Sequence, residues 1–253
     1  MEELIIYWIA LGLVILPINL IFKAPYGRHS SKKWGIMIDN RLGWIIMELP
    51  ALVVCPFVYF LFESTYNLSL LFISIWILHY FNRTIIYPLR IKTKGKKMPL
   101  TIACSAFFFN IINGFFNGYF IALINIESLN YLLIYFGLFL FLVGFFINVY
   151  SDNKLIKLRK NKEGYHIPKG GFFNYISCPN FFGEIIEWLG FSIMTFNLAS
   201  LSFLIWTCCN LVPRSLAHHK WYLNKFEKYP KNRKAIFPFL LYNFVPVDCV
   251  YNK

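Results

Sequence analysis

Long apolar stretches alternate with short polar connections along most of the chain. Five of them are long enough to cross a bilayer as helices, namely residues 4–22, 43–62, 68–87, 100–124 and 131–149. A further stretch, residues 183–212, dips in hydropathy at Asn197 and fits either one long helix or two short ones. The runs lack the strict apolar–polar alternation of barrel strands. This pattern predicts an all-α, polytopic membrane protein.

Basic residues are concentrated in alternate connections. The connections near Glu63, Glu127 and Asn197 contain no Lys or Arg, whereas the other three loops contain 5, 5 and 6 and the C-terminal tail contains 8. This alternation holds if residues 183–212 form two helices, so we predict seven transmembrane helices. The positive-inside rule then places the N-terminus outside and the C-terminus in the cytosol, with cytosolic loops closing over a site. The membrane would be the endoplasmic reticulum in a eukaryote or the inner membrane in a bacterium.

Composition narrows the function classes further. The chain is 58% hydrophobic and only 15% charged, and its net charge of +13 is explained by topology and lipid contact rather than by nucleic-acid binding. Six cysteines form no C-x-x-C pair and are typical of small core residues. His218 and His219 are adjacent, so on a helix they point apart, and we predict no metal site. No feature indicates an obligate protein partner.

Two sets of polar residues are candidates for chemistry. Asn180, Glu184 and Glu187 share one helical face at the start of an apolar run, at or just inside a membrane boundary. Ionisable groups there are costly and therefore functional candidates, although a solvated first turn would also favour Glu184. Glu48 lies within an apolar run, where a carboxyl group can keep its proton and donate a hydrogen bond. The alternative is a structural bridge between Glu48 and Arg83.

Further polar residues recur at the predicted cytosolic helix ends, although they come from distant parts of the chain. Arginine groups gathered there could hold a pyrophosphate, and carboxylate and amide groups could hold ribose and nicotinamide edges. A single G-x-x-x-G, Gly114 to Gly118, would allow two helices to approach closely.

An ordered series of motifs extends over about residues 24–239. They are Ala24-Pro-Tyr-Gly-Arg28, Glu48-Leu-Pro50, Leu78-His-Tyr-Phe-Asn-Arg-Thr84, Asn148-Val-Tyr-Ser-Asp152, and the segments 164–177, 180–188, 218–222 and 226–234. Taken together, this series resembles the steroid 5-alpha-reductase family, the 3-oxo-5-alpha-steroid 4-dehydrogenases. The resemblance implies a seven-span oxidoreductase that acts on a CH–CH group.

The resemblance also implies an activity and a site. A member would use NADPH to reduce the Δ4 double bond of a 3-oxo-Δ4-steroid from the bilayer to the 5α-dihydro product, with hydride added at C5. Glu48 and Tyr80 would polarise the 3-keto oxygen. The implied cofactor positions are Tyr26, Trp44, Arg83, Asn148, Asp152, Arg159, Tyr165, Asn180, Glu184, Trp188, Arg214, His218 and Tyr222. Residues 1–253 would form one domain, with a steroid-binding half over about 1–125 and a cofactor-binding half over about 126–253.

Three positions depart from the family pattern. Met47 stands where many members have Gln before the catalytic Glu, which leaves open another α,β-unsaturated lipid as substrate, such as an enoyl thioester or a polyprenal. His166 stands where some members have Arg, and Cys104 or Ser105 where others do. These replacements bear on phosphate affinity and on the preference for NADPH over NADH.

Overall fold

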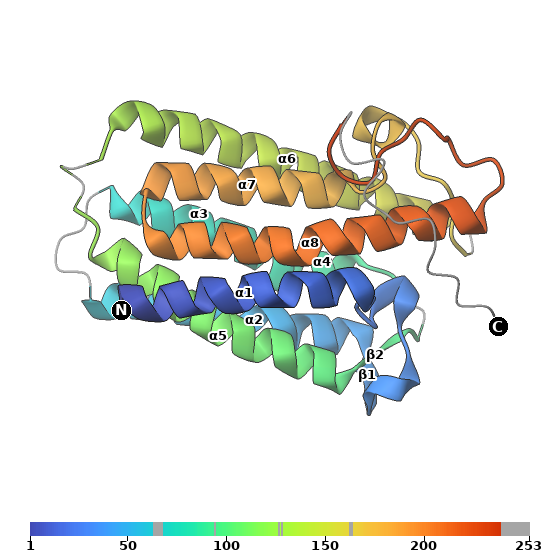
Figure 1. The fold of residues 1–253 in the computed structure, drawn as a ribbon, viewed down its shortest axis with the longest axis horizontal. Coiled ribbons are helices and arrows are strands. Elements are labelled where there is room, and N and C mark those ends of the chain that lie inside the picture. Colours follow the sequence, from blue (N-terminus) through green and yellow to red (C-terminus); the bar gives the residue numbers. More distant parts are fainter. Residues whose placement is uncertain (63–67, 94, 126, 128, 162–163, 239–253) are drawn as a thin grey trace.

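The computed structural model describes residues 1–62, 68–93, 95–125, 127, 129–161 and 164–238, and most of them are helical. The long helices run roughly side by side, and the loops at one end gather above α8 and beside the strands (Figure 1). Their bounds are α1 Glu2–Ile21, α2 Asn40–Phe62, α3 Ser69–Phe81, α5 Leu100–Ala122, α6 Tyr131–Asn161, α7 Pro179–Thr195 and α8 Leu198–Lys225. A π-helical turn, Asn82–Ile86, joins α3 to α4, Tyr87–Arg90.

Five helical segments in the described residues are long and apolar enough to cross a membrane. They are Glu2–Ile21, Asn40–Phe62, Ser69–Arg90, Leu100–Ala122 and Tyr131–Lys160. The prediction of a mainly helical, multi-pass membrane protein is therefore confirmed. The prediction of seven crossings is not confirmed, because neither α7 nor α8 is among these five segments; α7 has only 17 residues and falls short of the usual ~20.

The last apolar stretch divides into two helices, as the sequence favoured. Phe196 ends α7 in the left-handed region, with φ 43. Asn197 then caps α8, because its Oδ1 accepts a hydrogen bond from the backbone N–H of Ser200 at 3.0 Å. The dip in hydropathy thus marks a helix cap.

The connection near Glu63 lies outside the described residues.

A small sheet was not predicted. Strand β1, Met37–Asp39, pairs antiparallel with β2, Lys97–Pro99. Asp39 also caps α2, since its Oδ1 accepts from the backbone N–H groups of Arg41 and Leu42 at 2.8 and 3.1 Å. The sheet therefore joins the loop after α1 to the loop before α5 and fixes two basic segments beside each other.

Two helix pairs are held together by glycines. Between α6 and α7, the backbone at Gly144 approaches that of Gly183 and Glu187 so closely that a Cβ atom would overlap it. Between α5 and α2, Gly114 and Gly118 lie against Cys55 and its neighbours. Small residues allow helices in membranes to gain van der Waals contact along their length.

Gly144→Leu is expected to destabilise the protein strongly, because the added side chain would have to displace the α7 backbone rather than a flexible side chain. The measurement is thermal unfolding of purified protein in detergent. Leu142→Ala is the control, since Leu142 on the same helix is 49% exposed. Equal melting temperatures for the two variants would contradict this packing.

Trp76 of α3 fixes the relative depth of four helices. Its Nε1 donates to the backbone oxygen of Ala51 on α2 at 2.9 Å. Its ring lies 5.3 Å from that of Trp188 on α7 and 5.4 Å from that of Phe203 on α8. One turn closer to the basic loops, α2, α3 and α7 carry Glu48, Tyr80 and Glu184, which are therefore brought to a common level.

Candidate active site

A cavity of about 620 Å³ lies among the helices. Its lining includes residues of α1, α2, α3, α5, α6, α7 and α8, as well as the loops that carry Tyr26 and Tyr165. A volume of this size is typical of a small-molecule site. Every residue that the family resemblance placed in the site lines this cavity, except Asn148 and Trp188. The further candidate Glu187 does not line it either.

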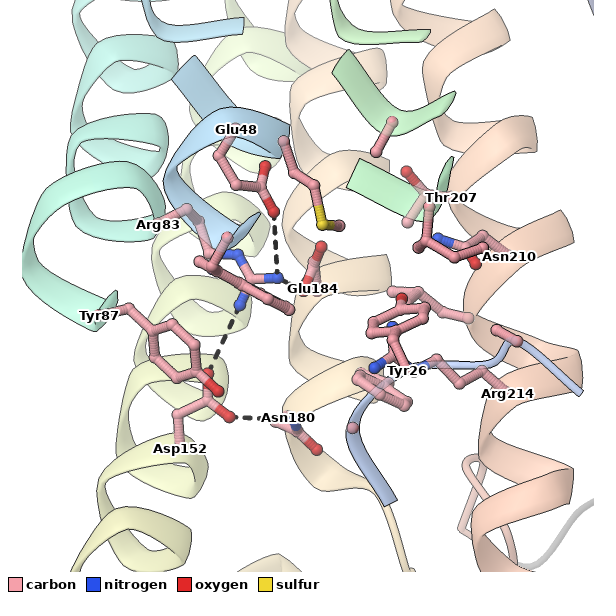
Figure 2. Close-up of a pocket in the computed structure, with 18 of the residues that line it drawn as sticks. Tyr26, Glu48, Arg83, Tyr87, Asp152, Asn180, Glu184, Thr207, Asn210 and Arg214 are labelled. Carbon is pink, nitrogen blue, oxygen red and sulfur yellow. Dashed lines mark hydrogen bonds and ion pairs between the residues drawn. The ribbon is translucent and has the colours of Figure 1, made fainter. Parts of the chain in front are cut away.

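Arg83 is shared by three carboxyl groups from three helices (Figure 2). Its guanidinium nitrogens lie 3.7 Å from Glu48 on α2, 3.6 Å from Asp152 on α6 and 3.9 Å from Glu184 on α7. Its side chain is 12% exposed, and its Cζ lies 5.0 Å from the Trp44 ring centroid. Arg83 is carried by the π-helical turn, a feature that is frequent at functional sites.

Amide groups organise the α6–α7 side of this cluster. Asn180 donates to Asp152 Oδ1 at 3.0 Å. Asn148 lies behind the cavity wall and donates to Glu184 Oε2 at 3.2 Å and to the Asn180 backbone oxygen at 3.0 Å. Asn148 therefore orients Glu184 and the first turn of α7 rather than facing the cavity.

The part of the cavity wall that contains Tyr80 is formed by packed aromatic side chains. Tyr80 is 3% exposed, and its ring centroid lies 4.9 Å from that of Trp76 and 5.9 Å from that of Trp188. Trp188 is 1% exposed and supports this wall from behind. The neighbouring His79 is held by Glu187, whose Oε1 lies 2.6 Å from His79 Nδ1. Glu187 thus has a buried partner in α3.

The end of the cavity beside the loops is cationic. Arg28 lies 4.7 and 4.6 Å from the ring centroids of Trp221 and Tyr222, and Arg214 lies 3.6 Å from that of Tyr26. Arg159 and Lys96 both lie over the Tyr165 ring, and both line the cavity. Among the salt bridges between described residues, none involves these four cations.

Two further observations show how strongly positive this end is. Arg28 Nη1 is buried without a hydrogen-bond partner among the described residues. Partial burial, together with the charges of Arg28 and Lys23, lowers the pKa of the nearby His29 to about 4. An unpaired buried guanidinium nitrogen is costly unless a ligand satisfies it. The donors and charges at this end therefore fit a phosphate or pyrophosphate group.

Sequence analysis missed some of the lining. Arg28 belongs to the Ala24–Arg28 motif, which was a usable signal, but it was not chosen as a site residue. Lys96 directly precedes β2, and its sequence position did not indicate a place in the site, because only the unpredicted β1–β2 sheet brings it to the cavity. The Tyr87 ring centroid lies 5.4 Å from Arg83 Cζ. Tyr87 follows Arg83, a predicted site residue, by about one helical turn.

Residues 96–241 match the sequence model of the family described as 3-oxo-5-alpha-steroid 4-dehydrogenase. The matched region is more than half of the chain. The chain belongs to the 3-oxo-5-alpha-steroid 4-dehydrogenase family. This membership confirms the resemblance seen in the motifs, and it places the protein among oxidoreductases that act on a CH–CH group.

Members of the family from plants and animals are similar over nearly the whole chain. The chain is 44% identical to "Steroid 5-alpha-reductase DET2" of Solanum lycopersicum over 87% of its length and 88% of that protein. It is 43% identical to the Arabidopsis thaliana protein of the same name, over 86% and 88%. It is 35% identical to human "3-oxo-5-alpha-steroid 4-dehydrogenase 1", over 91% and 92%.

Proposed function

We propose that this protein reduces the Δ4 double bond of 3-oxo-Δ4-steroids to 5α-dihydro products with NADPH. The observation that carries the proposal is a single cavity with two unlike ends. One end holds Tyr80 in an aromatic wall with Glu48 beside Arg83, and the other gathers four cations without salt-bridge partners among the described residues. The names of the relatives favour a steroid over an enoyl thioester or a polyprenal.

Glu48 and Tyr80 would polarise the 3-keto oxygen. Addition of hydride at C5, the β carbon of the enone, moves negative charge onto that oxygen. Two hydrogen-bond donors aimed at the oxygen stabilise the enolate, and such donors act most strongly in a site from which water is excluded. C4 then takes a proton from water, which completes the reduction of the double bond.

Charge balance supports a proton on Glu48. One guanidinium, that of Arg83, faces three carboxyl groups in a cluster whose side chains are 9–14% exposed. A single positive charge compensates a single carboxylate, and uncompensated charges in such a setting are costly. A proton on Glu48 reduces the excess negative charge of the cluster. It also provides the O–H group that Glu48 would donate to the 3-keto oxygen of the steroid.

The residues of the basic end fit NADPH. The reduced nicotinamide, when bound, supplies the hydride. Arg28, Arg159, Arg214 and Lys96 would hold the phosphates, since guanidinium groups bind phosphate oxygens in pairs of hydrogen bonds. Asp152, Asn180 and Glu184 offer acceptors and amides for the ribose and the carboxamide. In this proposal, residues 1–125, the expected steroid-binding half, would also supply Arg28 and Lys96 to the cofactor.

Arg159→Gln is expected to raise KM for NADPH by about tenfold with a smaller change in kcat, because it removes a charge-assisted phosphate contact. Steady-state kinetics at saturating steroid gives both constants. Lys160→Gln is the matched control, since Lys160 is the next residue on α6 and is exposed. If the two variants gave the same KM for NADPH, Arg159 would not be a phosphate ligand.

The reaction itself is tested by product identification. Protein purified in detergent is incubated with NADPH and a 3-oxo-Δ4-steroid, and the products are resolved by mass spectrometry against 5α- and 5β-dihydro standards. The expected product is the 5α isomer. A parallel panel contains an enoyl thioester and a polyprenal. Turnover of a panel lipid without turnover of the steroid would refute the proposed substrate.

We also propose that all seven long helices cross the membrane, with the C-terminus in the cytosol. Their shared direction in Figure 1 and the basic loops gathered at one end support this topology. In sealed vesicles with the cytosolic face outward, a C-terminal tag should be digested by added protease and an N-terminal tag should be protected. The opposite pattern would reverse the orientation.

A further inference from the structure

Two polar side chains of α8, Thr207 and Asn210, lie on the cavity wall that faces Glu48 (Figure 2). They are three residues apart, so they share one face of the helix. Among the hydrogen bonds of the described residues, neither side chain takes part; Thr207 is only 6% exposed, whereas Asn210 is exposed. Polar groups at this depth are costly and are functional candidates by default.

The depth of Thr207 follows from the packing around Trp76. The Trp76 ring contacts Phe203 of α8 at 5.4 Å, and its Nε1 binds Ala51 of α2. One turn closer to the loops, α8 reaches Thr207 just as α2 reaches Glu48 and α3 reaches Tyr80. Thr207 therefore lies level with the two residues that would hold the 3-keto oxygen, but on the opposite wall.

Apolar side chains of other helices also line the cavity, among them Leu11 and Ile15 of α1 and Phe109 of α5. Asn19 of α1 is already engaged, because its Nδ2 donates to the backbone oxygen of Cys209 at 3.2 Å and holds α1 against α8. No described carboxyl group forms a salt bridge on this wall. The pair is itself neutral, and Asn210 lies one helical turn before Arg214, where the apolar part of the cavity meets its cationic end.

We propose that Thr207 and Asn210 form a second polar subsite that binds an oxygen substituent at the end of the steroid remote from the 3-keto group. This inference rests on the proposed function. A threonine hydroxyl and an asparagine amide both donate and accept hydrogen bonds, so the subsite takes a hydroxyl or a keto oxygen. With its 3-keto oxygen at Glu48 and Tyr80, the rigid ring system spans the cavity and presents ring D to α8.

The first test compares two substrates of the unmodified protein. One is a 3-oxo-Δ4-steroid with a hydroxyl at C17, and the other is the same steroid without oxygen on ring D. The expected kcat/KM is about tenfold higher for the hydroxylated steroid, because the other leaves a polar pair unsatisfied in the complex. Equal values would overturn the subsite but leave the proposed reaction intact. Absence of turnover with either would overturn the proposed reaction itself.

The second test removes the polar groups at nearly constant shape. Thr207→Val and Asn210→Leu are each expected to lower the ratio of the two kcat/KM values, and the double variant should bring it close to one. Thr207→Ser, which keeps the hydroxyl, should keep the ratio. NADPH-dependent thermal stabilisation reports that each variant is folded. A raised KM for NADPH with an unchanged steroid ratio would show that the pair contacts the cofactor instead, and would overturn the proposal.

Discussion

Glu48→Gln and Tyr80→Phe are each expected to lower kcat for a 3-oxo-Δ4-steroid by about 10²- to 10³-fold. In the proposed mechanism either change would weaken or remove one donor to the 3-keto oxygen, and the loss of one such donor typically has this size. Gln replaces an acidic O–H by a weaker amide donor, and Phe leaves no donor at all. KM for NADPH should change little, because neither residue belongs to the cationic end.

Tyr59→Phe is the matched control for the hydroxyl deletion. The Tyr59 hydroxyl lies 2.7 Å from Ser69 Oγ in the core, and Tyr59 does not line the cavity. Its loss should lower stability without a comparable loss of kcat. Rates are measured under saturating NADPH with variants shown to be folded by thermal unfolding. Wild-type kcat in Glu48→Gln and Tyr80→Phe would remove both residues from the proposed mechanism.

Arg83→Met is expected to reduce the free energy of unfolding by about 3–5 kcal/mol and to abolish most activity. Without the guanidinium, Glu48, Asp152 and Glu184 would be left in one poorly hydrated cluster without their shared cation. The apolar Met keeps much of the side-chain volume, so the effect reports charge rather than packing. Thermal unfolding of the purified variant in detergent, with and without NADPH, measures this loss of stability.

Two comparisons isolate the electrostatic part of that loss. Arg90→Met removes a charge from an exposed position at the end of α4 and should leave stability nearly unchanged. Adding Asp152→Asn and Glu184→Gln to Arg83→Met should recover part of the stability, because fewer carboxylates then lack a cation. An Arg83→Met protein as stable as Arg90→Met would mean that the cluster does not depend on Arg83.

The helices were predictable because their apolar runs are long and their polar interruptions are sharp. Even the division between α7 and α8 was visible, since Asn197 is both a hydropathy minimum and a capping residue. The β1–β2 sheet was not predictable. Its strands have three residues each and lie in charged loops without apolar alternation, so only the tertiary structure reveals the pairing.

The candidate site was predictable from ordered motifs, but only as a set of residues. The sequence does not show which of them face a cavity, since that depends on how the helices are rotated. Asn148 and Trp188 lie behind the wall for this reason. Thr207 and Asn210 show the converse case, because they line the cavity but were not predicted as site residues. Single polar residues in an apolar helix belong to no motif, and only the structure shows that they face Glu48 across the cavity.

The glycine contacts have a mechanical consequence. The α6–α7 and α2–α5 pairs touch backbone to backbone, so each should behave as one stiff body. Glu48 belongs to one body and Asp152 and Glu184 to the other, and Arg83 bridges the two. Exchange of a bulky, rigid ligand should therefore proceed by relative tilting of intact bodies about that ionic junction, without unwinding of any helix.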